Sequence, residues 1–193
     1  TGVQTCALPI FGRPNVGKST LFNQLTRSRE ALVADQPGLT RDRQYGTVRH
    51  DTRPFVLIDT GGLVSNADPL EQLIASQAAY AMDEADLIAL VLDGREGLTP
   101  EDESIASQIR QTGHAVVPVV NKTDGLDPIL ACGEFHKLGL GEPIPIAAAH
   151  RRGLSKLIER FTQQWRGPIP EVETTQDEYG SRIKISVVGR PNV

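Results

Sequence analysis

The chain has 193 residues, of which 39% are hydrophobic and 23% are charged, as in an ordinary globular protein. Its formal net charge of −4 gives no reason to expect nucleic-acid binding by this piece. Two cysteines are too few for a disulfide framework or a four-cysteine zinc site, and no apolar run reaches the roughly 20 residues that span a bilayer. We therefore expect a protein of the reducing cytoplasm, with no membrane partner.

The elements expected first along the chain are a strand, a helix and a hairpin. The sequence does not start with Met, and we expect about residues 1–9 to be a sequencing or assembly scar. Residues 7–11 predict a strand despite Pro9, and residues 18–25 predict a helix. Residues 45–50 and 54–58 predict a hairpin.

Helical and apolar segments then alternate to the end of the domain. Helical patterns cover 69–82, 101–112, 128–138 and 153–165, and apolar runs cover 87–92, 115–120 and 144–146. Continuous apolar strands that alternate with helices are typical of a parallel sheet covered on both faces. The predicted fold class is therefore α/β, with a mostly parallel sheet and helices on both of its faces.

A Gly-x4-Gly-Lys-Ser phosphate loop lies between the first strand and the first helix. Its residues, with the next one, are Gly12, Arg13, Pro14, Asn15, Val16, Gly17, Lys18, Ser19 and Thr20. Glycines let successive backbone N–H groups point inward, and the following helix adds the positive end of its dipole. Lys18 can reach the β- and γ-phosphates, and the hydroxyl of Ser19 can bind Mg²⁺. The loop predicts a P-loop NTPase that binds a nucleoside triphosphate.

Two further segments add a metal ligand and a base-recognition motif. Asp59 ends an apolar strand, where a second Mg²⁺ ligand is needed, and the N–H of Gly62 can bond the γ-phosphate. Asn121, Lys122 and Asp124 follow another apolar strand. Asp124 can accept both N–H donors on the guanine edge, whereas adenine lacks the N1 proton, and the stem of Lys122 can cover the ring. The motif favours GTP and GDP over a general ATPase or kinase reading.

The phosphate loop begins a second time at the end of the chain. Residues 189–193 repeat residues 12–16, which predicts a tandem pair of similar domains. We expect a first GTP-binding domain over 1–166, an acidic linker over 167–181 and the start of a second domain over 182–193.

These motifs, in this order, resemble the double-Era GTPase family. Other matching segments are residues 37–43, 59–62 and 93–100. The resemblance implies slow GTP hydrolysis, a role in large-subunit ribosome assembly with rRNA as a partner, and Thr40 as a Mg²⁺ ligand and catalytic switch residue. It also implies that Ala147 and Ala148 contact the guanine oxygen, with Arg151 where the family has a glycine.

The source of catalysis stays open at this point. Many GTPases place Gln after the Asp-x-x-Gly motif, but Leu63 stands there and cannot orient water. The resemblance suggests K⁺ held partly by Asn15, and a structural role for Asn15 is equally compatible with the sequence. The alternative functions are a nucleotide-sensing module with negligible turnover and that of another Era-like GTPase. We assign catalysis to neither Arg41 nor Arg43, and expect the four dispersed histidines to lie on the surface or in loops.

Overall fold

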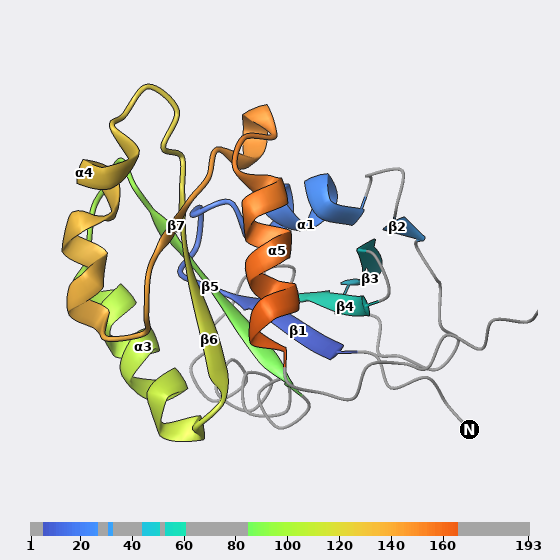
Figure 1. Ribbon diagram of the computed structural model, residues 1–193. Helices are drawn as coiled ribbons and strands as arrows, with labels where there is room; N and C mark the ends of the chain where they lie inside the picture. Colours follow the sequence, from blue (N-terminus) through green and yellow to red (C-terminus); the bar gives the residue numbers. More distant parts are fainter. Residues whose placement is uncertain (1–5, 27–30, 33–43, 51–52, 61–84, 166–193) are drawn as a thin grey trace, which may run out of the picture.

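The computed structural model describes residues 6–26, 31–32, 44–50, 53–60 and 85–165. Seven strands in these residues form one sheet in the order β2-β3-β4-β1-β5-β6-β7 (Figure 1). The strands are β1 Cys6–Phe11, β2 Ala31–Leu32, β3 Gln44–His50, β4 Arg53–Asp59, β5 Leu87–Asp93, β6 Ala115–Asn121 and β7 Ile144–Pro145.

The sheet is parallel except at one edge. β4, β1, β5, β6 and β7 pair in parallel, while β3 pairs antiparallel with β4 and β2 with β3. The predicted hairpin is thereby confirmed, as are the strands predicted from residues 7, 87 and 115. Pro9 and Pro118 lie inside β1 and β6 without ending either strand.

Helices cover both faces of the sheet, as the alternating pattern predicted. They are α1 Lys18–Thr26, α3 Pro100–Thr112, α4 Pro128–Gly133 and α5 Leu154–Gln164, with 3₁₀ turns η2 Glu134–Leu138 and η3 Ala148–His150. Figure 1 shows α3 and α4 on one side of the sheet and α1 and α5 on the other. The helix predicted over 128–138 is divided, because it continues as a 3₁₀ turn after Gly133, a residue of low helix propensity.

Each face of the sheet has its own hydrophobic core. One cluster joins α1 and α5 to the sheet and includes Leu21, Leu157 and Phe161. The ring of Phe161 meets that of Phe55 edge to face, with centroids 5.9 Å apart. The other cluster joins α3 and the segment after α4 to the opposite face and includes Ile109 and Phe135. The apolar side chains of α5 therefore lie in the core.

The start of α3 is fixed by local chemistry, which in turn fixes the loop that precedes it. Thr99 is the N-cap and forms a capping box with Asp102, and Pro100 takes the first helical position. The helix ends at Gly113, which has a φ of 73°. The loop over 94–99, between β5 and α3, is therefore held at the end that joins α3.

Several predicted features lie outside the described residues. They are the helix over 69–82, the linker over 167–181 and the second phosphate loop, together with Thr40, Arg41, Arg43, Gly62 and Leu63. Among the described residues, no helix is long and apolar enough to cross a bilayer.

Candidate nucleotide-binding site

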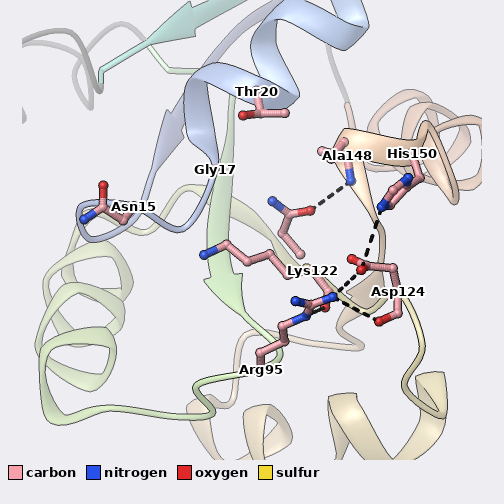
Figure 2. Close-up of a pocket in the computed structure, with 10 residues that line it drawn as sticks. Asn15, Gly17, Thr20, Arg95, Lys122, Asp124, Ala148 and His150 are labelled. Atoms are coloured by element: carbon pink, nitrogen blue, oxygen red, sulfur yellow. Dashed lines mark hydrogen bonds and ion pairs between the residues drawn. The ribbon is translucent and has the colours of Figure 1, made fainter.

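A cavity lies at the carboxyl edge of the sheet, where ligands bind in open α/β folds. The phosphate loop follows β1, while Asp93 and Asn121 are the last residues of β5 and β6. The cavity has a volume of about 350 Å³. It is lined by Asn15, Gly17, Thr20, Arg95, Asn121, Lys122, Asp124, Ala148, Ala149 and His150 (Figure 2). The predicted phosphate and base motifs are thus brought to one cavity.

Two positions of the phosphate loop accept only glycine. Gly12 has a φ of 147°, and a Cβ there would lie 2.3 Å from the carbonyl oxygen of Val91. Gly17 has a φ of 99°, and a Cβ there would lie 2.4 Å from Nδ2 of Asn121. Both positions combine a left-handed backbone with close packing. The loop can therefore curl tightly ahead of α1, as a phosphate cradle requires.

Lys18 bridges the phosphate loop from inside. Its Nζ donates to the carbonyl oxygens of Gly12 at 2.7 Å and Arg13 at 2.8 Å. Burial lowers the pKa of Lys18 below its ordinary value, and the negative charges of Asp59 and Glu101 partly oppose that shift. The ammonium group is therefore partly desolvated beside the loop, where a phosphate charge would interact with it more strongly than in water.

Asp59 and Ser19 are the predicted Mg²⁺ ligands that the structure describes. Asp59 is 2% exposed at the end of β4, and the register pairs it with Ile10 of β1. The hydroxyl of Thr60 donates to the Ile10 carbonyl at 2.5 Å, which fixes the end of β4 beside β1. Ser19 is exposed in the first turn of α1. No group of three or more His, Cys, Asp or Glu side chains is placed to hold a metal within the described ranges. One carboxylate and one hydroxyl suit Mg²⁺, which commonly completes its shell with phosphate oxygens and waters.

Asn121 joins the two halves of the cavity. Its Nδ2 donates to the carbonyl oxygen of Val16 at 2.9 Å, and its Oδ1 accepts from the N–H of Ala148 at 3.0 Å. The side chain is buried, so both bonds are shielded from water. A guanine oxygen would have to share the Ala148 N–H with Asn121 or use another N–H of the same turn. Asn121 therefore sets the spacing between the phosphate loop and the turn over 147–150.

Lys122 lies along the cavity and is held by Asp93. Its Nζ lies 2.6 Å from Oδ2 of Asp93. Burial alone would raise the pKa of Asp93, but hydrogen bonds from Lys122 and from the backbone N–H groups of Arg95 and Glu96 outweigh burial and lower it. The carboxylate therefore stays ionised at neutral pH. Figure 2 shows the Lys122 stem extended across the cavity, where it can cover a flat ring.

Two basic side chains, those of Arg95 and His150, lie beside Asp124, and the sequence motifs did not assign either of them to the site. Nη2 of Arg95 pairs with Oδ2 of Asp124, and Nε2 of His150 lies 3.8 Å from the same oxygen. Arg95, His150 and Ala149 all line the cavity. His150 does lie on the surface, as predicted, with 58% of its side chain exposed. The position of Arg95 two residues after an apolar strand was the one available signal for its role.

Arg13 was predicted among the nucleotide-binding residues, but its side chain does not line the cavity. It is buried and lies 3.3 Å from Asp102 of α3 and 2.8 Å from Glu96. Val16 is fully buried in the core, and the side chain of Pro14 is exposed. At Arg13 and Val16 the backbone N–H therefore remains available to face a phosphate, whereas Pro14 has no N–H to donate.

Strained backbone gathers around the cavity. Among the described residues, the non-glycine residues with positive φ are Asn15, Lys122 and Arg151. The first two line the cavity, and the third follows directly after the turn over 147–150. Such strain is typical of sites where function constrains the backbone.

The φ of 56° at Arg151 leads to a stability prediction. Replacing Arg151 with glycine should raise the free energy of unfolding by about 0.5–1 kcal/mol, because glycine adopts this conformation without a Cβ clash. Chemical denaturation measures the change. The matched control is Arg152→Gly, which should destabilise the chain, since Arg152 has no positive φ. A loss of stability in both variants would contradict the left-handed assignment.

Comparison with known proteins then gives the family. Residues 8–122 match the family described as 50S ribosome-binding GTPase, which is more than half of the chain. The chain belongs to this family. It is 54% identical over 187 residues to GTPase Der from Thioalkalivibrio sulfidiphilus, covering 96% of this chain and 39% of that protein. It is 47% identical over 186 residues to GTPase Der from Marinomonas sp., covering 96% and 42%. The resemblance to the double-Era family is thereby confirmed, and the chain spans about two fifths of these relatives' length.

Solved structures agree with the predicted fold. Era in complex with MgGDPNP and part of 16S ribosomal RNA matches with a TM-score of 0.70 and 29% identity, covering 88% of this chain and 59% of that one. The FeoB G-domain from Methanococcus jannaschii matches with a TM-score of 0.60 and 21% identity, covering 85% of this chain and all of that one. The second likeness concerns the fold alone. The fold is that of a P-loop GTPase G domain, as the sequence predicted.

Proposed function

We propose that this chain binds GTP and GDP with Mg²⁺ in the cavity and hydrolyses GTP to GDP and phosphate. The observation that carries the proposal is that Gly17 of the phosphate loop and Asp124 of the base motif line one cavity, at a separation set by Asn121. Relatives at 47–54% identity bear the name GTPase, which supports the same activity.

At the phosphate end, the backbone of residues 12–18 and the Lys18 ammonium supply donors and positive charge. Ser19 and Asp59 would hold Mg²⁺ together with phosphate oxygens and water, and Thr40 would join them by resemblance to the family. Mg²⁺, when bound, supplies positive charge against the phosphate oxygens. The glycines at positions 12 and 17 support this fit, since any Cβ there would clash.

At the base end, Asp124 would accept the N1–H and 2-amino donors of guanine. The extended stem of Lys122 would cover one ring face, and the turn that carries Ala147 and Ala148 would offer an N–H to the guanine oxygen. An adenine would leave the Asp124 carboxylate without its N1–H partner, a loss of about 1–3 kcal/mol. This asymmetry supports guanine over adenine nucleotides.

The hydrolysis step depends on groups outside the described residues, Thr40 and Gly62, and on K⁺ held partly by Asn15. Single-turnover hydrolysis of GTP by the 193-residue chain, with Mg²⁺ and saturating chain, tests it in K⁺ and in Na⁺. We expect inorganic phosphate release in K⁺, at least about tenfold faster than in Na⁺. Equal rates in the two cations would reject the K⁺ site. Tight binding with no phosphate release in either cation would favour a nucleotide-sensing module instead.

For the whole protein, we propose a cytoplasmic factor for assembly of the large ribosomal subunit. The family description names the 50S subunit, while the Era structure contains 16S rRNA. The net charge of −4 suggests that RNA contacts lie elsewhere in the longer protein, which would include a second GTP-binding domain after the linker over 167–181. The natural full-length protein should sediment with isolated 50S subunits in the presence of a non-hydrolysable GTP analogue. Sedimentation with 30S subunits alone would contradict this role.

A further inference from the structure

Arg95 makes three contacts to the base-recognition segment. It lies in the loop between β5 and α3, and its guanidinium faces the cavity beside Lys122 and Asp124 (Figure 2). Nη2 pairs with the carboxylate Oδ2 of Asp124 and donates to the Asp124 backbone oxygen at 3.4 Å. Nε donates to the backbone oxygen of Lys122 at 3.3 Å. One side chain thus binds two carbonyls and one carboxylate of the same turn.

The loop that carries Arg95 is itself anchored. Oδ1 of Asp93 accepts from the backbone N–H of Arg95 at 2.9 Å and of Glu96 at 3.3 Å. Glu96 pairs with Arg13 of the phosphate loop at 2.8 Å. The other oxygen of Asp93 holds Nζ of Lys122. Arg95 therefore reaches Asp124 from a fixed base, so the contact can orient the carboxylate.

The turn that Arg95 binds needs such support. Lys122 has a φ of 62°, a left-handed conformation that costs a non-glycine residue about 1–2 kcal/mol. The Asp124 side chain is 25% exposed, so burial alone does not fix its orientation. A nearby alternative partner exists in His150, 3.8 Å from the same oxygen. Without Arg95, the carboxylate would be free to turn toward that side of the cavity.

Arg95 does not exclude guanine from Asp124. A carboxylate offers about four acceptor positions on its two oxygens. Guanine requires two of them, one for N1–H and one for the 2-amino group. The Arg95 guanidinium uses one position on Oδ2 and leaves the remainder for a base.

We propose that Arg95 is a positioning residue for guanine recognition, which holds the Asp124 carboxylate in the orientation that accepts both donors of the base. The inference rests on the proposed binding of guanine nucleotides. It adds to that proposal a specific dependence on the 2-amino group, because only a correctly turned carboxylate meets two donors at once.

The test compares GDP with inosine diphosphate, which lacks the 2-amino group. Calorimetry is carried out on the 193-residue chain, Arg95→Ala, Arg95→Lys and Arg160→Ala. Arg160, on α5, is a matched control, because its Nη2 also lies 2.9 Å from an acidic side chain, that of Glu142. Arg95→Ala should weaken GDP binding about tenfold and inosine diphosphate binding about threefold or less. The GDP affinity of Arg95→Lys should lie between those of the wild-type chain and Arg95→Ala, since one ammonium group cannot reproduce the several contacts of the guanidinium.

Each outcome of this test decides the role of Arg95. A smaller GDP preference in Arg95→Ala, with Arg160→Ala unchanged, supports it. Equal weakening for both nucleotides, no change, or tighter binding of GDP would overturn it, the last by showing that Arg95 competes with the base. Failure of the wild-type chain to bind GDP would instead overturn the proposed function, and is seen before any variant is compared.

Discussion

Replacing Asn121 with alanine should lower the free energy of unfolding by about 3 kcal/mol and reduce GDP affinity at least tenfold. The substitution leaves the Val16 carbonyl and the Ala148 N–H without their buried partner. Each unsatisfied buried group costs about 1–3 kcal/mol. The phosphate loop and the turn over 147–150 would then no longer be held at a fixed separation, so one nucleotide could not engage both.

Chemical denaturation and calorimetry with GDP measure the two effects of Asn121→Ala. Gln108→Ala is the control, since Gln108 is exposed on α3 and its amide is truncated in the same way. The control should stay within about 0.5 kcal/mol of wild type. An Asn121→Ala chain as stable as the control would show that the bridge between the two loops does not carry the stability assigned to it.

Replacing Lys18 with alanine should weaken GTP binding about 100-fold while changing stability by about 1 kcal/mol or less. The ammonium would make charge-assisted bonds to phosphate, each worth about 1.5–3 kcal/mol. Its bonds to the carbonyls of Gly12 and Arg13 add little net stability, because the cation is partly desolvated, as its lowered pKa indicates.

Titration of GTP into Lys18→Ala, together with thermal denaturation, separates binding from stability. Lys156→Ala is the matched control, because Lys156 is exposed on α5 and does not line the cavity. Unchanged GTP affinity in Lys18→Ala would remove the phosphate role from this lysine. A parallel collapse of stability would show that its structural bonds matter more than its charge.

Most of the fold was predictable because its signals are local. The phosphate-loop motif predicts a strand before it and a helix after it. The apolar runs that form β5 and β6 are continuous, as is typical of strands in a parallel sheet covered on both faces. Asp59 and Asn121 each follow an apolar run in the sequence, which predicts that both lie at the carboxyl ends of strands. Parallel pairing brings those ends to the same edge of the sheet. The helix predicted over 128–138 is divided at Gly133, because a glycine of low helix propensity interrupts a pattern that apolar periodicity alone extends to residue 138.

The parts that could not be predicted depend on contacts between distant segments. Arg95 meets Asp124 across 29 positions, and Asn121 meets Val16 across 105. No pattern of residue spacing in the sequence predicts contacts between segments so far apart. Arg13 was grouped with the nucleotide contacts because it lies inside the motif, but its burial against Asp102 appears only once α3 is packed. Residue types and their spacing predicted the phosphate loop, whereas the direction in which the Arg13 side chain points depends on the packing of the fold.

The most direct test of the account is calorimetry of the purified 193-residue chain with Mg²⁺ and four nucleotides, GTP, GDP, ATP and ADP. Guanine recognition by Asp124 predicts that both guanine nucleotides bind at least about 100-fold tighter than the adenine ones, and that Asp124→Ala loses this preference. Equal affinity of the wild-type chain for ATP and GTP, or no Mg²⁺-dependent binding of either, would contradict it.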